Sequence, residues 1–386
     1  MRLFRVPQLV LVPFLLLNLP AMGQLAGQDI HIGVGGPLTT GSATFGIEMR
    51  QAVDLAVAER NRAGGILGAH VVADAMDDAA DSAKGEAVAK EFCAHPAVLG
   101  VIGHVNSGVT IAASKVYAAC SLTMITPMSS NPQVTEGGLG NVFRLTNRDD
   151  RKGPGLARYL IDKDHKHRAV VIDDQTAYGK GLADSFVAGF TAHNGAIAAR
   201  QSVSVGQTNF DSLLSALPAD FDVVFFAGIR EGALILKSMR ERGMSQLFAC
   251  GDGCWDVKGF IVPAAGTAEQ GEGVRILSAA PTLGLVPGSA EFAAAYTTQY
   301  GPINNYAANS YDSARVLLAA TEAAAKAKLA LPSRSDVVAT LKGLSFQGIA
   351  YAEPITWDAK GDNKAAVIFV NAVAGDRFKE IDQIGD

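Results

Sequence analysis

The sequence predicts an α/β fold built from two doubly wound parallel-sheet units, and three observations lead to this prediction. Short apolar runs of strand length alternate with amphipathic patterns of helical spacing along most of the 386-residue chain. The alternation begins again after residues 144–146, and no long flexible linker separates the two units. Glycines such as Gly64, Gly65 and Gly195 stand where helical patterns stop. Alternation of this kind is typical of parallel sheets covered by helices on both faces.

The first unit is predicted from the N-terminal part of the chain. Its opening helix carries Met49, Val53, Ala56 and Val57 at helical spacing, which gives it one apolar face. The predicted strands cover residues 30–35, 71–75, 98–102 and 122–126, and the predicted helices cover 47–62, 82–93 and 109–119.

The second unit repeats this plan. Its predicted helices cover residues 153–163, 178–194, 210–217 and 231–242, and its strands cover 169–173, 198–204, 223–227 and 247–250. Beyond it the sequence predicts two more helices, over 290–300 and 307–328, and strand-like pieces near 349, 355 and 367–371.

Residues 1–23 are predicted to be a secretory signal peptide. Arg2 and Arg5 give a positive start, residues 9–17 form a short apolar core, and Ala21 and Gly23 frame a small-residue cleavage site. The apolar core is too short to cross a bilayer, although a retained membrane anchor is the alternative. We therefore expect an exported, periplasmic monomer that is not embedded in the membrane.

Composition excludes some classes of partner. The net charge is −5 and charged residues make up 18% of the chain, so there is no basic surface for nucleic acid. Nothing in the sequence calls for a cofactor or a bound metal.

Four cysteines and an exported chain make disulfides the expected arrangement. Cys93 and Cys120 each end a helical pattern that feeds a strand, and neighbouring crossover helices bring such ends together, so we predict a Cys93–Cys120 bond. Cys250 and Cys254 flank a tight Gly-Asp-Gly turn and are predicted to pair locally. A zinc site is the weaker alternative, because no nearby histidine or second cysteine pair supports it.

Candidate ligand-binding residues follow the predicted strands, since open α/β sheets bind ligands beyond the carboxyl ends of their strands. Ser107 follows the strand over 98–102 and begins a helix, whose free N–H groups and dipole favour an anion. Met128, Ser129 and Ser130 follow the next strand. The second unit offers Tyr178, Ile229 and Asp252 at the same edge. Hydroxyls and a helix end on one side, with a carboxylate and an aromatic ring on the other, suit an amino acid.

At these residues the chain resembles the branched-chain amino-acid (Leu/Ile/Val-type) substrate-binding proteins of ABC importers. The resemblance rests on several stretches in the same order: residues 36–39 with 45–46, 61–68, 77–78, 101–104, 125–127, 178–181, 251–253 and 311–312. It implies the periplasmic binding protein type I fold, in which two lobes are joined by three crossings and close on a ligand by hinge bending. It implies a first lobe of residues 28–146 plus 279–348 and a second of 147–278 plus 349–386. The implied partner is the permease of an ABC transporter.

The resemblance also implies roles for the site residues. Ser107 and Ser130, with the backbone around Met128, would hold the α-carboxylate of the ligand. The Met128 carbonyl and Asp252 would hold its α-ammonium. Phe45, Tyr178, Ile229 and Tyr306 would form the walls. The family often has tyrosine where Phe45 and Ile229 stand, so this chain should have a more apolar wall.

Two other functions compete with this interpretation. The same fold binds amides or aromatic acids, or acts as a ligand sensor, in other proteins of this kind. A dehydrogenase is suggested by Tyr159 and Lys163 at Tyr-x-x-x-Lys spacing, but residues 33–36 lack the G-x-G-x-x-G pattern that a dinucleotide requires. His104 is expected to be a buried structural histidine. We therefore expect a binding protein and not an enzyme.

Overall fold

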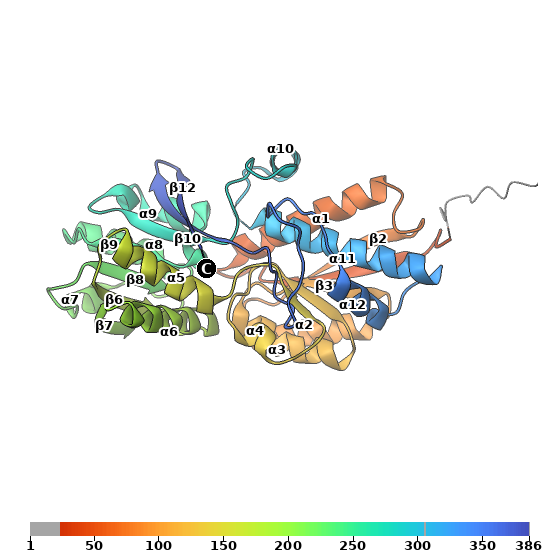
Figure 1. Cartoon of the computed structure of the whole chain (residues 1–386), viewed down its shortest axis with the longest axis horizontal. Coiled ribbons are helices and arrows are strands. Elements are labelled where there is room, and N and C mark those ends of the chain that lie inside the picture. The colour runs from red at the N-terminus through yellow and green to blue at the C-terminus, as the bar shows by residue number, and fades with distance from the viewer. Residues whose placement is uncertain (1–23, 305, 386) are drawn as a thin grey trace, which may run out of the picture.

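The computed structural model describes residues 24–304 and 306–385, and these form two lobes that each contain one β-sheet (Figure 1). The predicted signal peptide, residues 1–23, lies outside the described residues. None of the helices in the described part has the length and apolar character needed to span a membrane.

The first lobe is built on a five-stranded parallel sheet in the order β2-β1-β3-β4-β5. Its strands are β1 (Asp29–Gly36), β2 (His70–Asp77), β3 (Val98–Gly103), β4 (Thr123–Thr126) and β5 (Val142–Arg144). The helices α1 (Ala43–Arg62), α2 (Ser82–Ala94), α3 (Ser107–Ala119) and α4 (Gln133–Glu136) connect them. Three later helices join this lobe: α10 (Ser289–Tyr300), α11 (Ala307–Lys328) and α12 (Arg334–Gly343). Every residue of β3 is buried, as expected for a strand covered on both faces.

The second lobe is built on a seven-stranded sheet in the order β12-β11-β10-β9-β8-β6-β7. Its parallel strands are β6 (Arg168–Asp173), β7 (Ala196–Ser202), β8 (Val223–Ala227), β9 (Leu247–Cys250) and β10 (Val274–Ser278). Helices α5 (Asp149–Asp162), α6 (Ala177–Ala192), α7 (Asp211–Ser215), α8 (Glu231–Glu241) and α9 (Val262–Ala264) belong to this lobe.

The C-terminal strands differ from the prediction. β11 (Ile368–Ala374) and β12 (Arg377–Ile384) form an antiparallel hairpin at one edge of the second sheet, whereas the sequence predicted a single piece ending at residue 371. The pieces predicted near 349 and 355 are not strands, and only an isolated bridge joins Phe346 to Ile355. The second sheet is therefore mixed rather than wholly parallel.

The chain passes between the lobes three times. The first crossing follows β5, the second follows β10, and the third precedes β11. The hydroxyl of Tyr351 brings these segments together, because it lies 2.9 Å from the carbonyl oxygen of Leu145 and 3.1 Å from that of Ala279.

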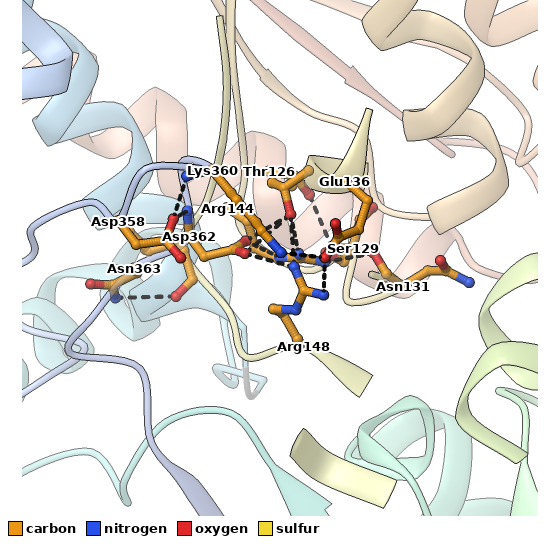
Figure 2. Close-up of polar contacts among 12 residues, drawn as sticks. Thr126, Ser129, Asn131, Glu136, Arg144, Arg148, Asp358, Lys360, Asp362 and Asn363 are labelled. Carbon is orange, nitrogen blue, oxygen red and sulfur yellow. Dashed lines mark hydrogen bonds and ion pairs between the residues drawn. The ribbon is translucent and has the colours of Figure 1, made fainter. Parts of the chain in front are cut away.

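The third crossing lies later in the chain than the predicted boundary at residue 349. Asp362 forms an ion pair with Arg144 at the end of β5, and Asn363 donates its backbone N–H to the Arg144 carbonyl (Figure 2). The Trp357 ring packs on Phe143, with 5.1 Å between ring centroids. Residues 355–363 therefore lie with the first lobe, to which these contacts fix them, and not with the second.

Both predicted cysteine pairs are disulfides in the structure. Cys93 at the end of α2 bonds to Cys120, the residue that follows α3. Cys250 at the end of β9 bonds to Cys254, across the turn that carries Asp252. The zinc alternative is thereby removed, and no cluster of metal-ligating side chains occurs among residues 24–304 and 306–385.

Candidate functional site

A cavity lies between the lobes, at the carboxyl ends of the parallel strands. It contains about 370 Å³ of space between protein atoms, counted to its open mouth. It is lined by Phe45, Val105, Asn106, Ser107, Met128, Tyr178, Ile229, Asp252, Gly253 and Tyr306. The lining thus includes seven of the nine residues proposed from the sequence as ligand contacts.

The first lobe contributes the start of α3. Asn106 stands at the N-cap position without a side-chain capping bond, and Ser107 is the first residue of the helix. Both line the cavity, so the N-terminal end of the helix faces it. The Ser107 oxygen accepts a hydrogen bond of 3.3 Å from the backbone N–H of Asn131, which leaves its own hydrogen free to be donated. The Asn106 Oδ1 is buried and has no hydrogen-bond partner in the described chain. This wall therefore offers both a hydroxyl donor and an amide acceptor.

Ser129 and Ser130 do not line the cavity. The Ser129 hydroxyl lies 2.9 Å from the carbonyl oxygens of both His104 and Val105, so it ties β4 to the end of β3. The Ser130 carbonyl accepts the backbone N–H of Asp149, at the start of α5. Both serines are buried and connect segments behind the cavity wall.

Met128 lines the cavity, but its backbone N–H is engaged within the protein. The N–H groups of Met128 and Ser129 point to the hydroxyl oxygen of Thr126, at 3.4 Å and 3.0 Å. The N–H groups of this segment are therefore less available to a ligand than the resemblance implied.

The second lobe places Asp252 in the tight turn after β9. Gly253 makes this turn possible, since a Cβ atom there would lie only 2.4 Å from the carbonyl oxygen of Gly228. The Tyr178 hydroxyl donates to Asp252 Oδ1 at 2.9 Å and accepts the N–H of Gly253 at 2.9 Å. The carboxylate is thereby held at the cavity wall, where Asp252 is 2% exposed.

Asp252 also has a cationic partner that the sequence analysis missed. The ammonium of Lys152, on α5, contacts Asp252 Oδ2, and the Tyr306 hydroxyl donates to the same oxygen. Lys152 is completely buried. It stands in a run of charged residues from Arg148 to Lys152, a pattern typical of an exposed helix start, so nothing in the sequence distinguished it.

A second carboxylate lies close to this pair. Asp149 is buried, neither of its carboxylate oxygens accepts a hydrogen bond of ordinary geometry, and its Oδ1 is 3.9 Å from Lys152 Nζ. Burial raises the pKa of Asp149 to about 7, while the Lys152 ammonium and the facing Ser130 hydroxyl oppose this rise. Burial therefore favours the protonated form of this carboxyl group more than in an exposed aspartate.

Two tyrosines act as fixed hydrogen-bond donors at the same end. Burial, followed by the Asp252 charge, raises the pKa of Tyr178 and of Tyr306 well above the ordinary value for tyrosine. Both hydroxyls therefore stay protonated and donate to Asp252.

The remaining walls are apolar. Phe45 meets the Tyr306 ring edge-on, with 6.0 Å between centroids, and Trp255 also meets Tyr306 edge-on, at 5.3 Å. Ile229 is partly buried and completes the wall. These surfaces favour an aliphatic or aromatic side chain, since they offer little to a polar one.

The residues that suggested a dehydrogenase lie elsewhere. Tyr159 is on α5 and Lys163 is the residue that ends this helix, and neither lines the cavity. His104 is completely buried, with Nδ1 2.6 Å from Asp78 and Nε2 3.0 Å from the Tyr117 hydroxyl. This histidine belongs to the interior of the first lobe, as expected.

Comparison with known proteins connects this geometry to a family. The sequence model of the periplasmic binding protein family matches residues 29–376. The chain is 37% identical over 253 residues to Leu/Ile/Val-binding protein homolog 1 of Brucella suis, which covers 65% of this chain and 67% of that protein. It is 32% identical over 343 residues to an amino acid binding protein of Pseudomonas aeruginosa, covering 88% of each.

Solved structures show the same arrangement. A leucine-binding protein of Thermotoga maritima superimposes with a TM-score of 0.82 at 25% identity, covering 92% of this chain and 98% of that one. An ABC transporter substrate-binding protein of Desulfitobacterium hafniense, solved in complex with leucine, gives a TM-score of 0.74 at 27% identity, covering 92% and 100%. The fold predicted from the sequence is confirmed.

Proposed function

Because this chain belongs to the periplasmic binding protein family, we propose that it captures an apolar amino acid between its lobes and delivers it to the permease of an ABC importer. The relatives described above are named as Leu/Ile/Val-binding, leucine-binding or amino-acid-binding proteins. The family consists of substrate-binding transport proteins, and we propose that the ligand leaves the cavity chemically unchanged.

The observation that carries this proposal is the polar asymmetry of the cavity. A hydroxyl at a helix N-terminus lies on the first lobe, and the Asp252 carboxylate lies on the second. A zwitterion bridges such a pair, with its carboxylate at Ser107 and its ammonium at Asp252 and the Met128 carbonyl. Asp252 Oδ1 accepts one hydrogen bond, from Tyr178, and so has room for another.

The apolar walls set the side-chain class. The part of the cavity away from Ser107 and Asp252 is bordered by Phe45, Ile229 and the ring of Tyr306. This apolar space suits the side chain of leucine, isoleucine or valine. Ser130, behind the wall, would support the carboxylate end through the backbone, and Ser129 would hold the segment in place. The signal peptide predicted at residues 1–23 would direct the protein to the periplasm, where it would work as a monomer.

A thermal-shift screen with free amino acids, amides and benzoate-like acids tests the proposal. A tight binder raises the melting temperature, because it binds the folded state alone. We expect leucine, isoleucine or valine to give the largest shift. A response to amides or aromatic acids alone would contradict the amino-acid assignment.

Calorimetry on two variants then tests the roles of the residues. Asp252→Ala removes the carboxylate that would accept the ligand ammonium and leaves the buried Lys152 without its partner. Breaking a buried charge pair costs roughly 3–5 kcal/mol, so leucine affinity should fall on the order of 10²–10³-fold. Ser130→Ala keeps the backbone through which this residue would act, so it should cost about 1 kcal/mol of affinity at most. Unchanged affinity in Asp252→Ala would remove the ammonium-binding role of this residue.

A further inference from the structure

Lys152 supplies a positive charge inside the protein at the place where the ligand ammonium is expected. Its side chain is completely buried, and its ammonium contacts Asp252 Oδ2. Lys152 does not line the cavity, so it acts on a ligand through Asp252.

The hydrogen bonds of Asp252 are largely satisfied without a ligand. Its Oδ2 accepts from Lys152 and from the Tyr306 hydroxyl, and its Oδ1 accepts from the Tyr178 hydroxyl. A carboxylate has about four lone-pair positions, so roughly three are used by the protein itself. A ligand that brings no cation therefore leaves no unpaired buried charge at this end of the cavity.

The ammonium of a ligand meets the nearly neutral Lys152–Asp252 pair and not a free carboxylate. Lys152 cancels the charge of Asp252, and like charges placed side by side repel. Another carboxyl group nearby is that of Asp149, on the same helix as Lys152. Its Oδ1 lies 3.9 Å from Lys152 Nζ, and burial raises its pKa. Arg144 adds a further positive charge near Asp149.

On the basis of the proposed amino-acid site, we propose that Lys152 is a specificity-determining residue that admits apolar 2-oxo carboxylic acids alongside the matching amino acids. A 2-oxo acid keeps the carboxylate that the start of α3 receives and the side chain that Phe45 and Ile229 enclose. It carries a carbonyl oxygen in place of the ammonium, and the Lys152–Asp252 pair removes the usual penalty for the missing cation.

The test compares leucine with 4-methyl-2-oxopentanoate, which has the same side chain and carboxylate. Calorimetry on the wild-type protein should give dissociation constants within about tenfold of each other. In Lys152→Gln the charge of Asp252 is no longer neutralised by the protein. The dissociation constant of the 2-oxo acid divided by that of leucine should therefore rise by about tenfold or more. Asp252→Asn should move the ratio the opposite way, because it leaves the Lys152 charge uncompensated.

Two further variants separate this role from a structural one. Lys152→Arg keeps the charge and should keep the wild-type ratio, and Lys180→Gln removes an exposed lysine of α6 and should leave the ratio unchanged. A loss of folding stability weakens both ligands alike, so the ratio reports specificity even in a destabilised variant.

The outcomes distinguish this inference from the function on which it rests. If wild-type protein binds leucine but prefers it over the 2-oxo acid by about a hundredfold or more, the role of Lys152 is wrong and the amino-acid function stands. An unchanged ratio in both Lys152→Gln and Asp252→Asn also overturns it. If no amino acid binds at all, the proposed function itself fails.

Discussion

Arg144 and Asp362 are separated by 218 residues in the chain, yet they form an ion pair of 2.8 Å where the chain crosses between lobes (Figure 2). Arg144 is completely buried and also donates to the carbonyl oxygen of Asn131 at 2.7 Å. Arg148 reaches the other oxygen of Asp362 at 3.0 Å. The pair therefore joins the first crossing to the segment that leads into the third.

We predict that Arg144→Met destabilises the protein strongly. Removing one partner of a buried ion pair leaves a buried charge without compensation, at a cost of roughly 3–5 kcal/mol. Because Arg148 still faces Asp362, the lower end of this range is expected. Urea unfolding followed by circular dichroism measures the change.

The matched control for this prediction is Lys360→Ala. Lys360 pairs with Glu136 near the same network, but the two side chains are 50% and 42% exposed to solvent. Exposed pairs of this kind contribute little to stability. Equal losses in the free energy of unfolding for Arg144→Met and Lys360→Ala would show that burial of the Arg144–Asp362 pair does not increase its contribution to stability.

We predict that Glu48 makes the protein less stable as the pH rises. Burial and then the Asp256 charge raise the pKa of Glu48 to about 8, and its Oε1 has no hydrogen-bond partner in the described chain. A folded-state pKa above the unfolded value means that the folded state holds its proton longer. The contribution of Glu48 to the free energy of unfolding is therefore greatest below about pH 4.5. It falls by roughly 1.4 kcal/mol per pH unit up to about pH 8.

Glu48→Gln tests this pH dependence, because glutamine keeps the shape of a protonated glutamate. Free energies of unfolding, measured from pH 5 to pH 8, should diverge, with the variant becoming more stable than the wild type toward high pH. The difference between the two curves isolates Glu48 from other buried acids such as Asp174 and Asp312, whose pKa values burial also raises, to about 6. Parallel curves would contradict the prediction.

The Cys93–Cys120 bond is predicted to stabilise the first lobe. The two cysteines are 27 residues apart, and closing a loop of this length restricts the unfolded chain by about 3–4 kcal/mol. Replacing both cysteines with alanine should therefore lower the midpoint of urea unfolding. Titration of the denatured, unreduced wild type with a thiol reagent should find no free thiol before reductant is added.

The sequence predicted those helices and strands that have a regular apolar pattern of their own. The alternating strands and helices of the first lobe were predicted because each has its own apolar pattern and Gly64 and Gly65 mark where a helix ends. β12 was missed because its apolar residues, Phe378, Ile381 and Ile384, are three apart and do not alternate with polar residues. Exposure does alternate along the strand, so Ile381 faces solvent while the charged Glu380 and Asp382 take the partly buried positions.

The candidate site was predictable for residues that follow strands, and not for the rest. Ser107, Tyr178 and Asp252 lie in the turns or helix starts that follow apolar runs, so their edge of the sheet could be inferred. Lys152 could not be found in this way. Its burial depends on how α5 packs in the second lobe beside the turn after β9, and that is a tertiary contact between residues 100 apart.

Contacts between the lobes indicate that this conformation is closed. Thr44 on α1 donates to Asp256 in the second lobe at 2.8 Å, and Asn131 donates to the carbonyl oxygen of Ala177 at 2.6 Å. Arg230 donates to the carbonyl oxygen of Gly41 at the mouth of the cleft. These bonds join parts of the protein that must separate when the cleft opens, so they stabilise the closed form alone.

We predict that Thr44→Val weakens ligand binding several-fold without altering the cavity wall. Ligand affinity scales with the closed population, and a lost hydrogen bond to a carboxylate lowers that population. Calorimetry gives the affinity, and X-ray scattering should show a smaller contraction at equal ligand concentration below saturation. Thr298→Val removes a hydroxyl that bonds within α10 and should leave both measurements unchanged. Identical scattering curves for wild-type protein with and without saturating ligand would contradict closure by hinge bending. They would show that the ligand does not change the shape of the protein.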